Sequence, residues 1–372
     1  MGESMKILIT GSNGFVAKNL IAELKNRGYD DLLIIDKSSS DDELHKYCKE
    51  ANYVFHLAGV NRPLEVKEFK SGNVEFTEKL LNSLESTNNK CTVMYASSIQ
   101  ALSDNAYGKS KLDAEKVLTD YADRNKSNFH IFRLPNIFGK WSKPNYNSVI
   151  ATFCHNVSRD IPIKITDENV VIKLVYIDDL IDILIEKMLD ASAQSEVITL
   201  KKFYEKSLGE IARLIGQFKI YKDNYYINST NDSFEKKLYS TYLSYMPVSE
   251  LNTTAKMNKD ERGSFTELFK TLDRGQVSVN VSKPGITKGN HWHHTKNEKF
   301  VVVSGEGIIR FRKYGDHEII KYNVSGEKIE IIDIPVGYTH NIENIGSSDL
   351  ITIMWVNEIF DINRPDTYFL EV

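Results

Sequence analysis

The chain has 372 residues, 41% hydrophobic and 26% charged, which is typical of a globular protein with room for two separately folded cores. Its 47 basic and 51 acidic residues give a formal charge of −4. A small anionic ligand is compatible with this charge. The charge gives no reason to expect a nucleic-acid partner, because proteins that bind nucleic acids usually carry a basic face.

Targeting signals and cysteine use both indicate the cytoplasm. No apolar run approaches the roughly 18 to 20 residues that span a bilayer, so no membrane association is expected. Cys48, Cys91 and Cys154 are widely spaced, which indicates free thiols in a reducing compartment rather than a disulfide framework. The start lacks the long apolar stretch of a signal peptide. Residues 1–4 are interpreted as a leader or a cloning remnant, because Met5 begins the first strand pattern.

Short apolar runs alternate with helical patterns through the first part of the chain. The runs predicted to be strands are 5–10, 32–35, 53–57, 92–96 and 129–134. Helical stretches of roughly ten or more residues separate most of them. This alternation predicts an α/β fold, a doubly wound parallel sheet of the Rossmann type, over residues 5–245.

The pattern changes after about residue 255. Short β-rich runs separated by Gly, Asn, Asp and Pro follow, at 276–282, 300–303, 307–312, 318–324, 328–334 and 350–356. They predict an all-β barrel or sandwich over 254–372. The polar, tyrosine-rich stretch 221–253 is predicted to be a helix and connector, with 246–253 as the linker between two domains.

A glycine turn follows the first strand and opens the first helix. Gly11 and Gly14 let the backbone approach a pyrophosphate that the positive end of the helix can bind, and Ala17 takes the place of a third glycine. Asp36, at the end of the second strand, is placed to accept both ribose hydroxyls of an adenosine, which favours NADH. Lys37 beside it could instead bind the 2′-phosphate of NADPH, so both cofactors stay open.

Tyr107 and Lys111 are spaced to lie one turn apart on one face of a helix. There the ammonium can stabilise a phenolate and lower the pKa of the tyrosine from about 10 toward neutral pH. The tyrosine can give a proton to a carbonyl oxygen as hydride reaches its carbon. Ser98, at the end of the fourth strand, would complete the hydrogen bonding of that oxygen. The three residues are the predicted catalytic set of a nicotinamide-dependent reductase.

These motifs together resemble the extended short-chain dehydrogenase/reductase family that acts on nucleotide sugars. The resemblance rests on residues 11–17, 56–59, 72–77, 97–98, 107–111, 133–139 and 175–179. It implies a cofactor site made of Gly11, Asn13, Gly14, Phe15, Val16, Asp36, Lys37, Leu57, Ala58, Gly59, Lys111 and Pro135. It also implies that Asn136 lies beside the nicotinamide and the substrate, and that Ser98 rather than Ser97 is the catalytic hydroxyl. At Leu102 the chain departs from the family pattern, which affects substrate placement rather than the chemistry.

Five of the nine histidines fall in the last 82 residues, and three of these lie within 291–294. Alternation puts His291 and His293 on the same side of a strand, while Trp292 and His294 face the other way. Glu298 enters from the next turn, and His340 comes from a distant strand. Imidazoles with one carboxylate inside a barrel suit Zn, Fe, Mn or Ni. The predicted ligands are His291, His293, Glu298 and His340.

This second part of the chain resembles the cupins. The matching motifs are Gly285-x5-His291-x-His293-x4-Glu298-x6-Gly305 and Pro335-x-Gly337-x2-His340-x3-Asn344. Residues 260–267, Gln276 and 288–291 also resemble the deoxysugar-nucleotide 3,5-epimerases, which are cupins with a histidine base at the position of His291. The cupin motif makes His291 a metal ligand, whereas the epimerase pattern makes it the base. Both roles stay open. Arg262 and Lys288 belong to the epimerase pattern and are predicted to bind substrate.

The combination resembles, along essentially the whole chain, a bifunctional family of capsular polysaccharide synthesis on the route to UDP-N-acetyl-L-fucosamine. The resemblance implies a UDP-linked 2-acetamido-2,6-dideoxy-4-keto-hexose, epimerised at C3 in the cupin and then reduced at C4 by NADPH to the 6-deoxy-talose sugar. Zinc is the expected metal, with other divalent metals open, because epimerisation needs a Lewis acid and no redox change. A homodimer is expected.

Two alternatives remain. In one, the chain is a single-activity nucleotide-sugar reductase whose cupin serves only dimerisation. In the other, a cupin dioxygenase is fused to the reductase, which would require iron and consume oxygen.

An order of reaction follows for the bifunctional enzyme: a C3 hydrogen is acidic only while C4 is a ketone, so epimerisation precedes reduction.

Overall fold

The computed structural model describes residues 5–372, which divide into two compact units. The first unit runs to Gly216 and also contains Ser233–Pro247, whereas the second contains Gln217–Asp232 and Val248–Val372. The sequence placed a single boundary at 246–253, and the structure differs from it over 217–232. The reason is main-chain pairing: Lys270 N–H donates to the Tyr225 carbonyl and Ile227 N–H donates to the Lys270 carbonyl, at 2.9 and 2.8 Å.

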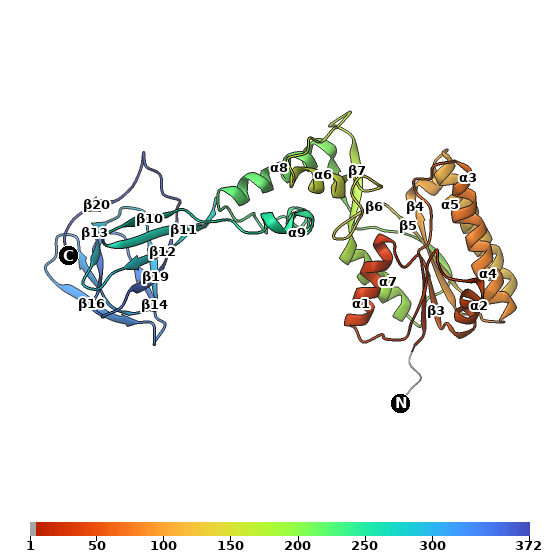
Figure 1. Ribbon diagram of the computed structural model, residues 1–372, viewed down its shortest axis with the longest axis horizontal. Helices are drawn as coiled ribbons and strands as arrows, with labels where there is room; N and C mark the ends of the chain where they lie inside the picture. Colours follow the sequence, from red (N-terminus) through yellow and green to blue (C-terminus); the bar gives the residue numbers. More distant parts are fainter. Residues whose placement is uncertain (1–4) are drawn as a thin grey trace. The chain divides into compact units, whose positions relative to one another are not determined.

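A six-stranded parallel sheet forms the centre of the first unit (Figure 1). Its order is β2-β1-β3-β4-β5-β8, with β1 at Ile7–Thr10, β2 at Leu32–Ile35, β3 at Tyr53–His56, β4 at Thr92–Ser98, β5 at Phe129–Leu134 and β8 at Glu196–Thr199. The predicted Rossmann-type sheet is confirmed. The strand order reverses between β1 and β3, and ligands of such sheets bind at the carboxyl edge beside this reversal.

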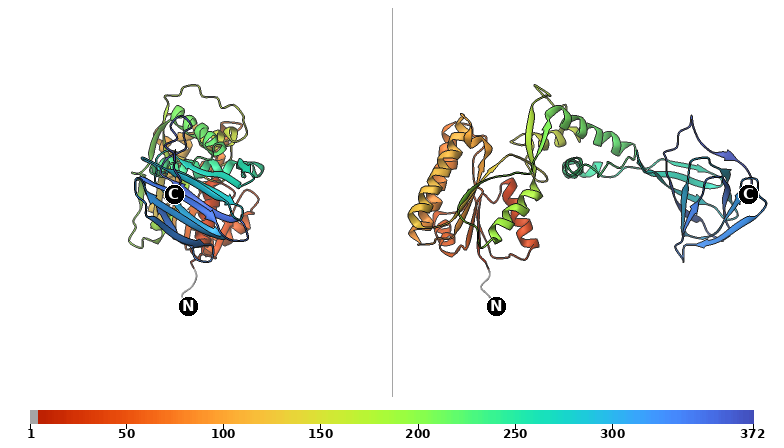
Figure 2. Two further views of the ribbon diagram at one scale, coloured as in Figure 1. Left: turned by 90° about the vertical axis from the view of Figure 1, so that its left-hand side faces the viewer. Right: turned by 180° about the vertical axis from the view of Figure 1, so that it is seen from behind.

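Helices cover both faces of this sheet (Figures 1 and 2). One face packs on α1 (Phe15–Asn26) and α7 (Ile177–Leu189), and the other on α2 (Asp41–Glu50), α4 (Phe76–Ser86) and α5 (Ala106–Asn125). The buried strand β1 serves both cores, because Ile7 and Ile9 point to the α1 side and Leu8 to the α2 side. A strand buried on both faces is continuously apolar, which is why its sequence shows no alternation.

Shorter elements complete the first unit. A small sheet has the order β6-β7-β9, from Asn136–Phe138, Val171–Tyr176 and Tyr204–Ser207, and the remaining helices are α3 (Lys67–Phe69), a π-helix (Lys70–Glu75), a 3-10 helix (Ile99–Leu102), α6 (Val149–Val157) and α9 (Ser233–Tyr245). Helix α8 (Leu208–Asp223) begins in the first unit and ends in the second. Within residues 5–372 no helix combines the length and the apolar character needed to cross a membrane.

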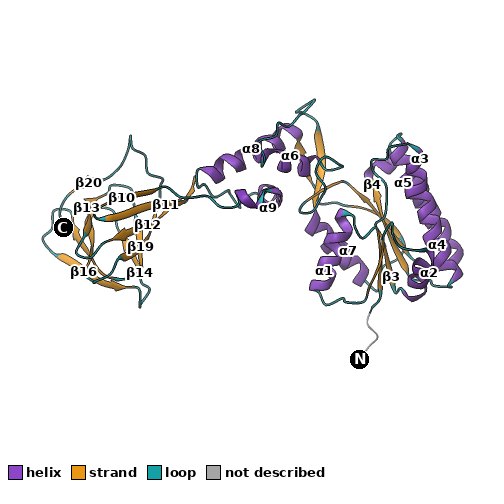
Figure 3. Cartoon of the chain, in the orientation of Figure 1, coloured by secondary structure: helices purple, strands orange, loops and turns teal. Residues whose placement is uncertain are grey.

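The second unit is built from antiparallel strands, without a helix between Met257 and Phe369 (Figure 3). One sheet has the order β10-β11-β12-β19-β14-β17 and the other β16-β15-β18-β13-β20. The strands are β10 (Met257–Asp260), β11 (Gly263–Thr271), β12 (Gly275–Ser282), β13 (Thr287–Trp292), β14 (Glu298–Ser304), β15 (Glu306–Lys313), β16 (Ile319–Ser325), β17 (Ile331–Ile334), β18 (Tyr338–Asn344), β19 (Leu350–Val356) and β20 (Tyr368–Phe369). Phe300 and Leu350 from the first sheet pack with Ile309 and Phe311 from the second. The predicted cupin-like fold is confirmed.

Candidate active sites

The predicted cofactor residues gather at the carboxyl edge of the parallel sheet. Gly11 has φ near +70°, and a Cβ added to it would lie 2.7 Å from Ala58 Cα, so a side chain there would clash with the segment that follows β3. Gly14 is the N-cap of α1, and Phe15 and Val16 open that helix while packing against the apolar core. The turn thus brings helix N–H groups to the position where a pyrophosphate binds in folds of this kind.

Asp36, just after β2, already has partners on both carboxylate oxygens. Oδ1 accepts from the Ser38 main-chain N–H at 2.7 Å and from its hydroxyl at 2.6 Å, and Oδ2 accepts from Asn13 Nδ2 at 2.6 Å. The Ser38 hydroxyl and then its N–H are the main reasons why the pKa of Asp36 is lowered. Lys37 beside it is exposed. Ribose hydroxyls would have to compete for Asp36 with these local donors.

Ser98, Tyr107 and Lys111 lie together at the same edge. Ser98 ends β4 and caps the 3-10 helix, while Tyr107 and Lys111 lie in the first turns of α5, which Asn105 caps. Burial raises the pKa of Tyr107, and a hydrogen bond with the Ser98 hydroxyl opposes that shift. The phenol is therefore protonated at neutral pH, which suits a group that must donate a proton.

Lys111 is buried beneath this pair. Its Nζ donates to the Ala96 carbonyl at 2.9 Å and lies 4.8 Å from the centroid of the Tyr95 ring. Burial lowers the pKa of Lys111 to about 8, with Glu115 opposing the shift. Leu57 and Gly59 follow β3, and a Cβ on Gly59 would lie 3.0 Å from Lys111 Nζ. The ammonium thus lies beside the segment that follows β3, and Lys111 is one turn from Tyr107 along α5.

The two serines at the end of β4 have different surroundings. Ser97 Oγ donates to Glu115 Oε1 at 2.5 Å, and Glu115 forms a buried ion pair with Arg133 at 2.6 Å. Ser97 therefore supports the fold, and Ser98 is the hydroxyl beside Tyr107.

Two further segments complete the edge. Pro135 and Asn136 follow β5, and Asn136 Nδ2 donates to the Lys173 carbonyl at 3.2 Å. Asn73, which the sequence did not single out, lies in the π-helix and holds the segment after Gly59: its Oδ1 accepts from Val60 N–H at 2.8 Å and its Nδ2 donates to Ser110 Oγ at 2.9 Å. The available signal was its place in the motif 72–77, since π-helices often occur at functional sites.

The second group of candidate residues comes from three strands of the cupin. His291 lies in β13, His293 follows that strand, Glu298 begins β14 and His340 lies in β18. One ligand atom from each lies within 4.8 Å of the others. Glu298 Oε2 is 3.1 Å from His340 Nε2 and 3.6 Å from His293 Nε2. The structure therefore brings together all four residues of the predicted ligand set.

These residues fit a metal ion. His293 Nε2, Glu298 Oε2 and both ring nitrogens of His340 are buried, and none makes a hydrogen bond of acceptable geometry. Buried polar atoms are normally paired, because an unpaired one is destabilising. A divalent cation would satisfy His293 Nε2, Glu298 Oε2 and one ring nitrogen of His340 together, and a mixed set of imidazole and carboxylate ligands suits zinc.

Charge in the cluster is arranged for cation binding. Burial opposes ionisation of Glu298, but His293 and His340 outweigh it and lower the pKa of Glu298 to about 2. Burial, followed by repulsion from His340 and His293, lowers the pKa of His291 to about 4. At neutral pH the carboxylate is therefore charged and the His291 imidazole neutral, the forms in which these groups bind metals.

A cavity of about 620 Å³ opens beside the cluster. His291 and His340 line it, together with Arg262, Lys288 and the apolar side chains Phe265, Phe300, Ile342 and Met354. Lys288 Nζ donates to Asn280 Oδ1 and to the Val281 carbonyl, both at 2.8 Å, and Arg262 pairs with Asp260 at 2.6 Å. Two of the three predicted substrate residues, Arg262 and Lys288, therefore line the same cavity as His291, whereas Asn136 lies in the first unit.

Comparison with known proteins follows the division into two units. Residues 7–199 match the NAD dependent epimerase/dehydratase family, and residues 258–368 match the polysaccharide biosynthesis C-terminal domain. The capsular polysaccharide assembling protein CapF from Staphylococcus aureus is 51% identical, with a TM-score of 0.92 over 99% of this chain and 100% of that chain. The chain belongs to the CapF family.

Other relatives extend this picture. A UDP-2-acetamido-2,6-beta-L-arabino-hexul-4-ose reductase from Pseudomonas aeruginosa is 41% identical over 368 residues, which cover 99% of each chain. A structure of CapF with the inhibitor 3-isopropenyl-tropolone is 47% identical with a TM-score of 0.88, over 99% of this chain and 100% of that one. UDP-glucose 4-epimerase from Thermotoga maritima, at 18% identity and a TM-score of 0.56 over 65% of this chain and 98% of that one, shares only the fold.

Proposed function

We propose that the chain is a bifunctional nucleotide-sugar enzyme, a C4 ketoreductase that also epimerises C3 of its substrate. The proposed substrate is a UDP-linked 2-acetamido-2,6-dideoxy-4-keto-hexose, and the proposed product is UDP-2-acetamido-2,6-dideoxy-L-talose, on the route to UDP-N-acetyl-L-fucosamine and capsular polysaccharide. The observation that carries the proposal is the presence of two separate clusters of reactive side chains in one chain that is 41% identical, over 368 residues, to a reductase of a UDP-linked keto sugar.

In the first unit, Tyr107 donates its phenolic proton to the C4 oxygen while Ser98 donates a hydrogen bond to the same oxygen. The nicotinamide cofactor supplies the hydride when it is bound. The Lys111 ammonium then stabilises the phenolate that remains on Tyr107, because opposite charges at short range in a buried site interact strongly. Asn136 is placed beside the substrate, and the residues around Gly11, Gly14 and Gly59 hold the cofactor.

We infer that the preferred cofactor is NADPH. The local partners of Asp36, Ser38 and Asn13, occupy the oxygens that would otherwise accept the ribose hydroxyls of NADH. Lys37 is exposed next to them and can meet a 2′-phosphate. NADH remains the alternative, since its hydroxyls could displace the Asn13 amide.

In the second unit, His293, Glu298 and His340 hold a divalent metal, with zinc as the proposed ion. When bound, it would act as a Lewis acid toward the sugar ketone. His291 is either a fourth ligand or the acceptor of the C3 proton, and its neutral imidazole at the cavity wall suits both roles. Arg262 and Lys288 bind the anionic diphosphate. Epimerisation comes first, because reduction of C4 removes the acidity of the C3 hydrogen.

We also propose that the chain is a cytoplasmic homodimer. The outer strands of the cupin expose several apolar side chains, Ile319, Ile320, Tyr322 and Ile331, at 42, 41, 45 and 65%. Exposed apolar side chains of this size are common at subunit interfaces. All three cysteines are free, which supports a reducing compartment.

Product analysis tests the proposed function. The UDP-4-keto sugar is incubated in deuterated water with and without NADPH, and the products are characterised by mass spectrometry and NMR. Without NADPH we expect deuterium at C3, and with NADPH a C4 alcohol with inverted C3. Reduction with C3 unchanged and no exchange would favour the single-activity reductase, and oxygen consumption would favour the dioxygenase.

A further inference from the structure

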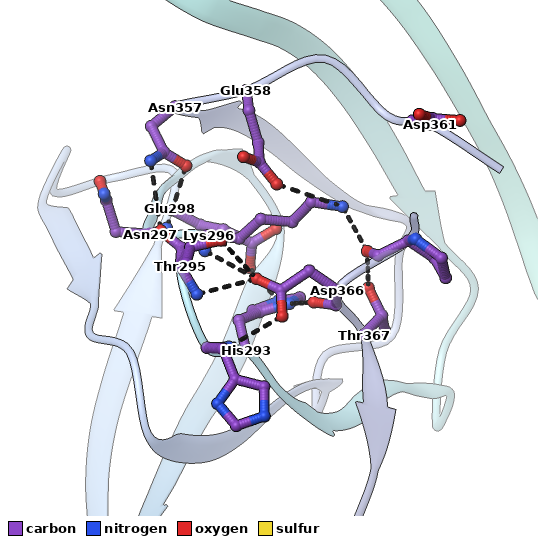
Figure 4. A network of polar contacts seen from close by, with 12 residues as sticks. His293, Thr295, Lys296, Asn297, Glu298, Asn357, Glu358, Asp361, Asp366 and Thr367 are labelled. Atoms are coloured by element: carbon purple, nitrogen blue, oxygen red, sulfur yellow. Dashed lines mark hydrogen bonds and ion pairs between the residues drawn. The ribbon is translucent and has the colours of Figure 1, made fainter. Parts of the chain in front are cut away.

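A segment distant in sequence encloses the loop between two proposed metal ligands, His293 and Glu298 (Figure 4). This segment, residues 357–371, is called the strap. At its start Asn357 Oδ1 accepts from Asn297 N–H at 3.1 Å, and the Asn357 N–H donates to the Asn297 carbonyl at 3.2 Å. At its end β20 pairs with β13, with Phe369 opposite His291. The strap thus contacts the ligand loop at its start and strand β13 at its end.

Asp366 forms the centre of these contacts. Its carboxylate accepts the main-chain N–H groups of His294, Thr295 and Lys296, at 3.0, 2.8 and 3.0 Å. It also accepts the Thr295 hydroxyl at 2.9 Å. Four donors from three consecutive residues converge on one side chain, so the path of the loop depends on Asp366 (Figure 4).

The main chain of the same residue holds the His293 ring. The Asp366 carbonyl accepts from His293 Nδ1 at 2.5 Å. Since a carbonyl only accepts hydrogen bonds, Nδ1 carries a proton, and in the neutral imidazole that binds a metal Nε2 would offer its lone pair to the cluster, 3.6 Å from Glu298 Oε2. Asp366 thus fixes the loop with its side chain and the orientation and tautomer of His293 with its carbonyl.

A second strap contact restrains the turn just before Asp366. The side chain of Lys296 is only 5% exposed, and its Nζ donates to the Pro365 carbonyl. The same amine lies 3.9 Å from Glu358 Oε1 and 5.4 Å from the centroid of the Phe360 ring. A lysine this buried requires such partners. Strap and loop are therefore joined at both the Asp366 carboxylate and the Lys296 amine.

From these contacts we propose that Asp366 is a positioning residue of the metal site, so that metal affinity depends on the strap although no strap residue is a ligand. The inference rests on the metal site of the proposed function and adds the element that orients one of its imidazoles. Groups that hold the second nitrogen of a histidine ligand typically change metal affinity by about 10- to 100-fold when they are altered.

The test measures metal binding rather than activity. Asp366→Asn and Asp361→Asn are prepared in the full chain, stripped with a chelator, and titrated with zinc against a chromophoric competitor. Asp361 is the matched control, because it lies in the same strap and, among residues 5–372, its hydrogen bonds stay within the strap, to Asn363 N–H and through its carbonyl to Arg364 N–H. We expect about 10- to 100-fold weaker zinc binding for Asp366→Asn and a change of less than about twofold for Asp361→Asn.

Cobalt-loaded protein gives a second measurement. The visible absorption of Co²⁺ reports ligand geometry, and we expect altered bands in Asp366→Asn but not in Asp361→Asn. Wild-type affinity and bands in a folded Asp366→Asn protein, checked by circular dichroism, would overturn the inference. If that variant does not fold, Thr295→Val decides, because it removes one donor to Asp366 without changing shape: weaker zinc binding supports the inference and unchanged binding overturns it. A wild-type chain that binds neither metal would instead reject the metal site itself.

Discussion

The two proposed sites differ in whether their buried polar groups already have partners. In the first unit, Lys111 Nζ has the Ala96 carbonyl, and Ser97 has Glu115. In the second, the atoms of His293, Glu298 and His340 face one another without hydrogen bonds. An unpaired buried polar group costs roughly 1 to 3 kcal/mol. The Lys111 ammonium of the proposed reductase site therefore has a protein partner, whereas the clustered atoms of the proposed cupin site would find theirs in a bound ion.

The sites also differ in how much chain assembles them. Ser98, Tyr107 and Lys111 come from one strand and the helix that follows it, whereas the four cupin ligands span 291–340 and three strands. The reductase site should consequently tolerate changes in the cupin, and the cupin site should depend on its bound ion for stability. The following predictions test this independence, from the largest expected effect to the smallest.

Tyr107→Phe should reduce NADPH oxidation by roughly 10²- to 10⁴-fold, the usual contribution of a positioned acid. Exchange of the C3 hydrogen with deuterated solvent should persist, because Tyr107 belongs to the first unit and the cupin cluster to the second. Stopped-flow absorbance and NMR measure the two reactions. Loss of exchange in a folded variant would show that the sites are coupled.

Glu298→Ala should reduce the metal content from stoichiometric to background, because it removes the only carboxylate among the four clustered ligands of the described chain. The cupin should also melt at lower temperature, since metal binding stabilises the fold that binds it. Elemental analysis and thermal denaturation measure both effects.

The matched control for this experiment is Glu330→Ala, which alters an exposed ion pair with Lys328. Reduction of a ketone that needs no epimerisation should continue in both variants. Equal metal content in Glu298→Ala and wild type would remove the proposed ligand set.

The reductase kcat/KM should fall as the pH rises through about 8, because burial lowers the pKa of Lys111 to about 8 and the ammonium is lost above that value. Below about pH 8 the Lys111 amine is charged, and kcat/KM should be constant. The pKa of Lys111 in the protein without ligands is the relevant one, because kcat/KM reports ionisations of the free enzyme. C3 exchange should show no matching loss, since His291, with a pKa of about 4, is neutral throughout this range. A reductase profile that stays flat to pH 10 would contradict the assigned role of Lys111.

Lys37→Ala should raise the KM for NADPH by roughly two- to fivefold and leave that for NADH unchanged, because an exposed charge pair contributes up to about 1 kcal/mol. Initial rates with both cofactors measure the effect. A wild-type preference for NADH of more than about tenfold would reject the NADPH assignment.

The sequence revealed the elements whose burial is visible as a run or a regular repeat of apolar residues. Strands β1 to β5 are apolar runs, and they were predicted close to their observed bounds. Strand β9 carries little apolar alternation and was not predicted, and β7 was not predicted either, although its sequence Val-Ile-Lys-Leu-Val-Tyr is largely apolar. Strand β13, Thr-Lys-Gly-Asn-His-Trp, was recognised only as the strand that carries His291 and His293. In β13 the inward positions hold ligands rather than apolar side chains, so function removes the pattern that predicts structure.

The candidate sites show the same limit. Ser98, Tyr107 and the histidines were recognisable because their side-chain chemistry is specific. Asp366 was not, because it holds His293 through a main-chain carbonyl, which every residue has, and because its side chain binds main-chain N–H groups from a distant segment. Hydrogen bonds made by main-chain groups do not depend on residue type, so they cannot be predicted from the kinds of residue in a sequence.

The pairing of Lys270 with Tyr225 and Ile227 determines how this chain can be divided. Strand β10 covers β11 only from Gly263 to Thr266, so residues 225–227 supply the partner at Lys270. A fragment beginning at residue 254 would expose this unpaired edge beside Phe269 and Leu272, which are already 51 and 72% exposed. Open edges with apolar neighbours promote aggregation. A soluble cupin fragment therefore requires residues 217–232 to be supplied, for example by circular permutation that joins them to its other end.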